Sequence, residues 1–303
     1  MAEGGITTVN PELLTNIYHH QPYAFISPNR PELSAEGKNV VVTGGGTGIG
    51  KAIAIAFAQA GAESVTIIGR RHHILQLAVQ EIQLAGAKRD TTKVAFEVAD
   101  LTVENQVVTA LDNVRSRFGP LHILVSNAGS LPTASPVTEY PSQELLRILE
   151  LNVISTLHVL KAFKPVASLD SAVVININSS MAHAKPLPAL GISAYSVSKA
   201  ANLKLVDYFA AENPEIHVVN VQPGIVATDM ADKSQLNSDL NQDEPELAGH
   251  FAVWAASPEA LFLRGKFVWA NWDAEELLKR SEEIQSSTIL ECGLNTSAIE
   301  IAK

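Results

Sequence analysis

A cluster of glycines between an apolar run and a helix-forming segment constrains this chain more than any other feature. Residues 40–42 are valines that lead into the cluster, and residues 51–60 leave it with apolar side chains at helical spacing. Glycine admits backbone angles and close approaches that a side chain would block. A ligand can therefore reach main-chain N–H groups at a helix N-terminus, where the dipole favours phosphate. The spacing of Gly44, Gly48 and Gly50 is GxxxGxG, which an ordinary tight turn would also explain.

Strand-like and helix-like segments alternate along the rest of the chain. We expect strands at 39–42, 64–69, 93–98, 121–125, 172–177 and 216–221, and helices at 48–60, 72–84, 103–118, about 142–163 and 194–211. Thr102 is the expected N-cap of the helix at 103–118. Alternation of this kind predicts an α/β fold in which one doubly wound parallel sheet forms three layers and a single domain.

The two ends of the chain differ from this regular part. Prolines interrupt residues 1–37, so we expect an irregular N-terminal extension in which only Pro11–Leu14 starts a short helix. Its role is open, since it is able either to wrap the domain or to dock a partner subunit in a homo-oligomer. Residues 38–272 are the expected Rossmann-type dinucleotide-binding and catalytic domain, and 273–303 a C-terminal helix and tail.

Composition argues against several classes of function. The formal net charge is -10 and there are no basic clusters, so we expect neither nucleic acid nor a membrane surface as a partner. The single cysteine, Cys292, rules out an internal disulfide or a cysteine-built metal site. Residues 1–10 lack the pattern of a signal peptide, and no apolar run approaches the ~20 residues of a membrane span. These features predict a soluble, cytoplasmic protein.

Three notable segments follow expected strands. They are the glycine turn, Asn127-Ala128-Gly129 and Ser179-Ser180. Ligands of doubly wound sheets bind beyond the carboxyl ends of the strands. The three segments are therefore expected to converge on one site.

Tyr195 and Lys199 are four residues apart on an expected helix and so share one face. Tyrosine titrates near pH 10, and a neighbouring ammonium lowers that pKa, which makes the phenol a usable general acid/base. A surface tyrosine packed on a lysine stem is the common alternative. Ser180 ends a strand and Asn152 lies within a helix, where asparagine is unfavourable. An ordinary turn serine and a solvated asparagine are their alternatives.

Taken in order, these motifs resemble the short-chain dehydrogenase/reductase family. The set comprises Gly44-x-x-x-Gly48-x-Gly50, Asn127-Ala128-Gly129, Asn152, Ser180, Tyr195-x-x-x-Lys199 and Pro223-Gly224, and the resemblance covers roughly residues 38–270. Residues 265–273 also resemble members from filamentous fungi.

The resemblance implies a nicotinamide cofactor and a shared proton relay. In this family the residue at Tyr195 is the acid/base, and the one at Lys199 lowers its pKa and binds the nicotinamide ribose. The serine, Ser180, orients the substrate oxygen, and Asn152 holds a water in the proton path. The residues implied to bind the cofactor are Gly44, Thr47, Gly48, Ile49, Gly50, Arg70, Asp100, Asn127, Gly129, Tyr195, Lys199, Pro223, Gly224, Val226 and Thr228.

The serine departs from the family spacing. In the family it lies two residues closer to the tyrosine than Ser180 does, and Ala182 occupies that place here. An insertion in the loop 181–193 accounts for the difference, and leaves Ser179 as an alternative. We favour Ser180 because the context Ser-Ser-Met-Ala fits best.

Charge after the second strand indicates the cofactor. An acid there suits the free ribose of NAD, whereas an arginine suits the phosphate of NADP. The strand ends in Gly69-Arg70-Arg71, so we expect NADP(H) to be favoured over NAD(H), with Arg70 pairing with the phosphate. Thr47 weakens this expectation, because many NADP-preferring relatives carry a basic residue at its position.

The substrate-facing loops, 183–193 and 227–240, contain several apolar residues and predict an apolar small-molecule carbonyl or alcohol, although ordinary loop packing explains them equally well. His183 is expected to be a polar loop residue, and no residue spacing suggests a metal site. The predicted function is NADP(H)-dependent interconversion of a ketone or aldehyde and an alcohol, as in a carbonyl reductase. A non-redox family member, such as an isomerase or dehydratase, and a dinucleotide-sensing protein are the alternatives.

Overall fold

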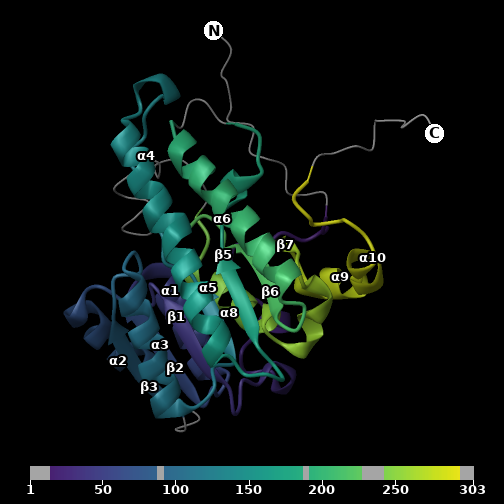
Figure 1. Ribbon diagram of the computed structural model, residues 1–303. Coiled ribbons are helices and arrows are strands. Elements are labelled where there is room, and N and C mark those ends of the chain that lie inside the picture. The colour runs from purple at the N-terminus through teal and green to yellow at the C-terminus, as the bar shows by residue number, and fades with distance from the viewer. Residues whose placement is uncertain (1–13, 87–91, 187–190, 227–241, 294–303) are drawn as a thin grey trace.

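The fold is a seven-stranded parallel sheet between two layers of helices, seen in a computed structural model that describes residues 14–86, 92–186, 191–226 and 242–293 (Figure 1). The strand order is β3-β2-β1-β4-β5-β6-β7, and every pair is parallel. The strands are β1 (Asn39–Thr43), β2 (Ser64–Gly69), β3 (Lys93–Val98), β4 (Ile123–Ser126), β5 (Val173–Ile177), β6 (His217–Gln222) and β7 (Phe267–Trp269). The predicted doubly wound α/β fold is confirmed.

The order of the strands reverses between β1 and β4, which are neighbours in the sheet. Strands β2 and β3 are added to the sheet on one side of β1. Strands β4, β5, β6 and β7 are added in turn on its other side. Such a switch point leaves a crevice beyond the carboxyl ends of the two strands. The glycine turn follows β1 and Asn127 follows β4, so both open onto this crevice.

The helices divide between the two faces of the sheet. One core contains side chains of α1 (Gly48–Gln59), α2 (His72–Gly86) and α8 (Pro245–Ala255). The other contains side chains of α3 (Glu104–Phe118), α5 (Ser155–Phe163) and α6 (Ser193–Glu212), and α5 and α6 lie in front of the sheet in Figure 1. Val40 and Val42 enter the first core and Val41 the second, because successive side chains of a strand point to opposite faces.

Two helical predictions need correction. The helix expected at 142–163 is divided into α4 (Ser142–Leu149), a π-helical turn η5 (Glu150–Ile154) and α5. Thr102 does not cap α3: its N–H and hydroxyl both donate to the Asp100 carboxylate, and Val103 holds the N-cap position without a side-chain bond. Aspartate competes well for nearby donors, which explains why Thr102 turns away from the helix.

Short helices and one strand complete the chain. The 3₁₀ turns are η2 (Ala24–Ile26), η3 (Pro31–Leu33), η4 (Val137–Glu139), η6 (Lys164–Val166), η7 (Ser180–Ala182) and η9 (Pro258–Leu263). Strand β7 was not predicted, since its three residues are too few to show a periodic pattern. Two short helices, α9 (Ala274–Lys279) and α10 (Ser281–Gln285), follow β7. Among the helices in the described part of the chain, none is long and apolar enough to cross a lipid bilayer.

The described part of the N-terminal extension, residues 14–37, wraps the domain. Tyr18 forms an antiparallel bridge with Trp272, and His19 exchanges hydrogen bonds with Asn271. Ile26 and Leu33 are buried in the core that also holds α1 and α8. Of the two roles considered for this segment, wrapping is therefore seen directly. Most of the helix start expected at 11–14 lies outside the described residues.

Candidate active site

The glycine turn is packed so tightly that side chains would not fit. Gly44 has a φ of +67°, and a Cβ on Gly50 would lie 2.4 Å from both the Gly44 carbonyl and Asn127 Nδ2. Asn127 ties the turn to β4, because its backbone N–H donates to Thr43 Oγ1 and its side-chain amide donates to the Thr43 carbonyl. The backbone around the start of α1 is thus held open toward the crevice as a bare peptide surface.

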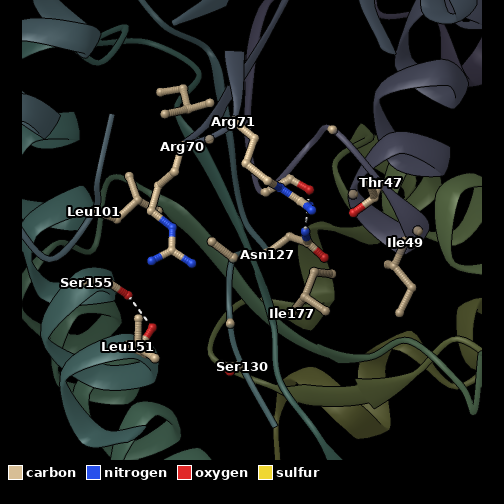
Figure 2. A pocket seen from close by; sticks show the side chains of 18 of the residues that line it. Thr47, Ile49, Arg70, Arg71, Leu101, Asn127, Ser130, Leu151, Ser155 and Ile177 are labelled. Carbon is tan, nitrogen blue, oxygen red and sulfur yellow. Dashed lines mark hydrogen bonds between the residues drawn. The ribbon is translucent and has the colours of Figure 1, made fainter. Parts of the chain in front are cut away.

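A cleft of about 670 Å³ runs along the carboxyl edge of the sheet. Figure 2 shows Thr47, Ile49, Arg70 and Asn127 on its walls. The predicted site residues that line it are Gly44, Thr47, Gly48, Ile49, Gly50, Arg70, Asp100, Asn127, Gly129, Tyr195, Lys199 and Pro223. Asn152, Ser180, Gly224 and Val226 lie outside its lining, and Thr228 lies outside the described residues. The glycine turn and Asn127-Ala128-Gly129 thus line one cleft as expected, whereas the third segment, Ser179-Ser180, is not part of its lining, although Asn178 just before it is.

One end of the cleft carries an exposed, loosely held charge pair. Arg70 Nη1 lies 3.9 Å from Asp100 Oδ2, and the Arg70 side chain is 64% exposed. Desolvation would raise the pKa of the Asp100 carboxyl, but hydrogen bonds from Thr102 and the charge of Arg70 outweigh it and lower that pKa. Arg70 therefore projects from the end of β2 as an exposed cation that can bind a second anion.

The other end of the cleft holds the tyrosine–lysine pair on α6. Lys199 is only 6% exposed, and its Nζ donates a hydrogen bond of 3.0 Å to the Ile177 carbonyl at the end of β5. Burial lowers the pKa of Lys199 to about 8. The Nζ lies 5.8 Å from the centre of the Tyr195 ring. An ammonium is thus held beside the phenol, as the spacing of the two residues predicted.

The pKa of Tyr195 moves in the direction opposite to the one expected. Burial raises it above its usual value of 10.0, and a hydrogen bond with the Ser179 side chain lowers it by a smaller amount. The prediction that Lys199 brings the phenol toward neutrality is therefore not what the free protein shows. A phenol that stays protonated at neutral pH is a proton donor, which suits the reduction of a carbonyl.

The two candidate serines have different surroundings, which favour the alternative Ser179 over Ser180 as the serine beside Tyr195, while the role itself stays a prediction. The Ser179 side chain bonds to Tyr195, and its Oγ also accepts the Met181 N–H at 3.2 Å. Ser180 starts the 3₁₀ turn η7, where its N–H donates to Gln222 Oε1. A 3₁₀ turn directly after the strand directs neighbouring side chains to different sides, and spacing from Tyr195 cannot reveal which of the two serines faces the phenol.

Asn152 lies in the π-helical turn η5 and is 2% exposed. Its side-chain amide donates to the Ser130 carbonyl and to Ser198 Oγ, while its Oδ1 accepts the Ser130 N–H. Its backbone carbonyl accepts hydrogen bonds from Asn202 and Thr156. These contacts anchor Asn152 to Ser130, Ser198 and Asn202, and the water-holding role that the resemblance implied stays a prediction.

Sequence reasoning missed a buried cluster of asparagines behind the relay. Asn202, on α6, accepts hydrogen bonds from Asn176 and Asn178 of the β5 segment and donates to the carbonyl of Asn152. All four are at most 3% exposed. The alternation Ile-Asn-Ile-Asn at 175–178 was the available signal, since a buried strand rarely carries two amides without partners.

The remaining sequence expectations concern the loops. His183 packs edge-on against Phe267, with ring centres 4.7 Å apart, and burial lowers its pKa. Gly224 has a φ of +97°, and its neighbour Pro223 reaches the cleft. The described residues contain no group of three histidine, cysteine, aspartate or glutamate side chains that could hold a metal ion.

The cleft fits a dinucleotide on structural grounds. Gly44, Gly48 and Gly50 line the cleft where α1 begins, and a helix N-terminus with bare backbone is a site that binds a pyrophosphate. The guanidinium of Arg70 stands at one end, and Tyr195 and Lys199 stand at the other. A Cβ on Gly129 would meet Asn152 Oδ1 at 3.3 Å, so the loop after β4 also lies close to the catalytic end.

Comparisons with known proteins agree with this geometry. The family model described as short chain dehydrogenase matches residues 38–239. A short chain dehydrogenase/reductase of Aspergillus aculeatus is 28% identical over 92% of this chain and 96% of its own length, and a short chain dehydrogenase of Monascus purpureus is 33% identical over 88% and 91%. Among solved structures, a short-chain dehydrogenase/reductase of Mycobacterium ulcerans has a TM-score of 0.70 and 30% identity, covering 81% of this chain and 91% of that chain.

A short chain dehydrogenase of Burkholderia cenocepacia, solved in complex with NADP, has a TM-score of 0.69 and 26% identity. The match covers 80% of this chain and 99% of that one. Fold, site and relatives lead to one conclusion: the chain belongs to the short-chain dehydrogenase/reductase family and is an NAD(P)-dependent oxidoreductase.

Proposed function

We propose that the protein is an NADP(H)-dependent carbonyl reductase that interconverts a ketone or aldehyde and an alcohol. The observation that carries this proposal is the arrangement at the inner end of the cleft. There the Lys199 Nζ lies 5.8 Å from the centre of the Tyr195 ring and donates to the Ile177 carbonyl, and a hydrogen bond with the Ser179 side chain lowers the pKa of Tyr195.

Each member of this group has a distinct part in the proposed reaction. When bound, NADPH would supply a hydride for the carbonyl carbon. Ser179 and Tyr195 hold the carbonyl oxygen, and Tyr195 donates its phenolic proton to that oxygen as the C–O double bond becomes single. The raised pKa of Tyr195 keeps this proton in place until it is needed. Lys199 stabilises the phenolate that remains, because its ammonium is close and poorly solvated.

The preference for NADP(H) rests on Arg70. No acidic residue follows β2 at residues 69–71, and the Arg70 side chain is free to move because it is largely exposed. A planar guanidinium binds phosphate with two parallel hydrogen bonds. Asp100, its partner at 3.9 Å, is held by Thr102 and so would remain in place when Arg70 turns toward a phosphate.

The substrate is proposed to be an apolar carbonyl compound. Leu131 and Leu151 line the same cleft as Tyr195. Burial of apolar substrate surface against these side chains would contribute about 25 cal/mol per Å².

The test uses the purified full-length chain with NADPH or NADH and a panel of ketones that range from small and polar to large and apolar. Loss of dihydronicotinamide absorbance reports hydride transfer. We expect turnover with NADPH to exceed that with NADH at equal subsaturating concentrations, and to rise with the apolar area of the ketone. Oxidation of neither cofactor with any ketone, together with isomerase or dehydratase activity, would overturn the proposal.

A further inference from the structure

His20, in the N-terminal extension, makes a hydrogen bond to a carboxylate that lies next to the catalytic end of the cleft. His20 Nδ1 is 2.5 Å from Asp243 Oδ1. The Asp243 side chain is 3% exposed, whereas that of His20 is 47% exposed. The backbone adds a second link, because the Glu244 N–H donates to the His20 carbonyl. A residue near the start of the chain thus holds a buried carboxylate just before α8.

Asp243 is tied just as closely to the turn after β6. Its Oδ2 accepts the Ile225 N–H at 2.6 Å, and its own N–H donates to the Ile225 carbonyl at 2.7 Å. Gly224 lies against the same carboxylate, since a Cβ there would be 2.5 Å from Asp243 Oδ2. The position of the carboxylate therefore determines the position of the backbone at 224–225.

This turn borders the reacting end of the cleft. Pro223 lines the cleft together with Tyr195 and Lys199. The nicotinamide is the part of the cofactor that carries the hydride. In the proposed reaction it therefore lies at the end of the cleft that holds Tyr195 and Lys199, beside Pro223. A shift of the backbone at 223–225 would move one wall of that part of the cleft.

We propose that His20 and Asp243 are positioning residues for the nicotinamide end of the cofactor, which makes the N-terminal extension part of the cofactor site. The inference rests on the proposed function, because it needs a nicotinamide beside Tyr195. A buried carboxylate is costly unless it is paired. His20 supplies the pairing that keeps the Asp243 carboxylate in place against Ile225.

The extension also contains a matched control. His19, the adjacent residue, pairs through Nε2 with Asp273 Oδ2 at 2.8 Å. Asp273 caps α9 by accepting the Glu276 N–H. This second histidine–aspartate pair fastens the same segment to the domain without contacting the turn at 223–225. Loss of His19 therefore reports the general effect of loosening the extension.

The experiment uses full-length His20→Ala, His20→Asn, Asp243→Asn and His19→Ala variants. An asparagine amide donor lies close to where Nδ1 of histidine lies, so His20→Asn should restore the contact in part. Two dissociation constants are measured for each variant by titration. One is for NADPH, and the other is for adenosine 2′,5′-bisphosphate, which has the adenosine half and its phosphate but no nicotinamide.

We expect His20→Ala and Asp243→Asn to weaken NADPH about tenfold, the effect of losing one hydrogen bond of average strength, and to leave the bisphosphate unchanged. His20→Asn should fall in between, and His19→Ala should match wild type with both ligands. Equal weakening of both ligands, or wild-type NADPH affinity in His20→Ala, would overturn the inference. If wild type binds the bisphosphate and NADPH but reduces no carbonyl, the proposed function fails, and the difference between the two ligands in His20→Ala still decides whether His20 positions the nicotinamide end.

A second measurement remains decisive if Asp243→Asn does not fold. Hydrogen exchange of the Ile225 amide is followed in ligand-free His20→Ala and His19→Ala. We expect faster exchange in the His20 variant only, because the acceptor of that amide is Asp243 Oδ2. Unchanged exchange in His20→Ala would contradict the proposed coupling.

Discussion

The two ends of the cleft are built on different physical principles. At the adenosine end, Arg70 is 64% exposed and its ion partner lies 3.9 Å away. At the catalytic end, Asn152, Lys199 and Asn202 are at most 6% exposed, and each is hydrogen-bonded to protein groups. Under the proposed function, the choice of cofactor depends on an exposed surface charge, whereas the chemistry depends on buried groups that are hydrogen-bonded to the protein. Changes at the catalytic end should therefore reduce turnover, and changes at the adenosine end should reduce affinity.

The largest effect is expected for Tyr195→Phe. This change removes the proton donor and keeps the ring, so turnover should fall by ~10²–10⁴-fold, the usual loss when a general acid is removed. NADPH affinity should stay near that of wild type. Steady-state kinetics and an NADPH titration check both parts. Turnover near that of wild type would remove Tyr195 from the mechanism.

A somewhat smaller loss is expected for Ser179→Ala. Removal of one hydrogen-bond donor to a developing oxyanion typically costs about 10²–10³-fold in turnover. Ser180→Ala is the matched control, since its hydroxyl is one residue away and the Tyr195 bond belongs to Ser179. Turnover of the two variants with one ketone decides between them. A larger loss in the Ser180 variant would restore the assignment made from sequence.

Arg70→Ala tests the adenosine end. Its hydrogen bonds to a phosphate are worth roughly 1.5–3 kcal/mol, so NADPH affinity should fall by about one to two decades. NADH affinity should hardly change. Arg71 also lines the cleft, so the double Arg70/Arg71 variant is measured alongside. Equal losses for the two cofactors, or equal affinities in wild type, would refute the phosphate contact.

The pH dependence should reveal Lys199. Its pKa of about 8 means that the ammonium is lost as pH rises through that value, so kcat/KM should decline above pH 8. The folded pKa lies below the usual 10.5, and the unfolded chain therefore binds more protons between about 8 and 10.5. The contribution of this group to stability rises over the same window.

These opposite trends separate loss of the ammonium from unfolding. Lys199→Met should be inactive. Its free energy of unfolding should also lack the rise between about pH 8 and 10.5 that Lys199 gives the wild type. Denaturant melts of both proteins across the window provide the measurement. A flat kcat/KM profile up to pH 10 would show that Lys199 stays charged or takes no part in the reaction.

Asn202→Leu is expected to act mainly on stability, with only a modest loss of turnover. The change leaves the amides of Asn176 and Asn178 without their shared acceptor, at a cost of about 1–3 kcal/mol for each buried group. Unfolding free energy should drop clearly, and turnover should fall less than in Ser179→Ala. Asn113→Leu, at an exposed amide that bonds to Glu97, is the control and should be nearly neutral. A larger loss of turnover than of stability would give Asn202 a direct catalytic role.

Much of the adenosine end could be predicted from local sequence. Runs such as Ser64–Gly69 carry β-branched residues at their four central positions, and the glycine spacing after β1 has a steric cause that any chain would share. Arg70 could be placed beside the cleft because it directly follows β2, and its contact with a phosphate stays a prediction. These features depend on residues that are close together in the chain.

The catalytic end resisted prediction because it depends on contacts between distant segments. Choosing between Ser179 and Ser180 requires the path of the chain through η7, and the role of Asn152 depends on a π-helical turn and on Asn202, fifty residues later. The pair of His20 and Asp243 joins residues 223 positions apart. Periodicity and motif spacing carry no information on such pairings.

The most direct test of the account measures the two ends separately in the same proteins. Single-turnover hydride transfer at saturating NADPH and the NADPH dissociation constant are determined for wild type, Tyr195→Phe, Arg70→Ala and the double variant. The account predicts that Tyr195→Phe slows only the transfer, that Arg70→Ala changes only the affinity, and that the double variant shows both effects unchanged, as expected for independent sites. Slow transfer in Arg70→Ala at saturation, or loss of NADPH affinity in Tyr195→Phe comparable to its loss of rate, would contradict it.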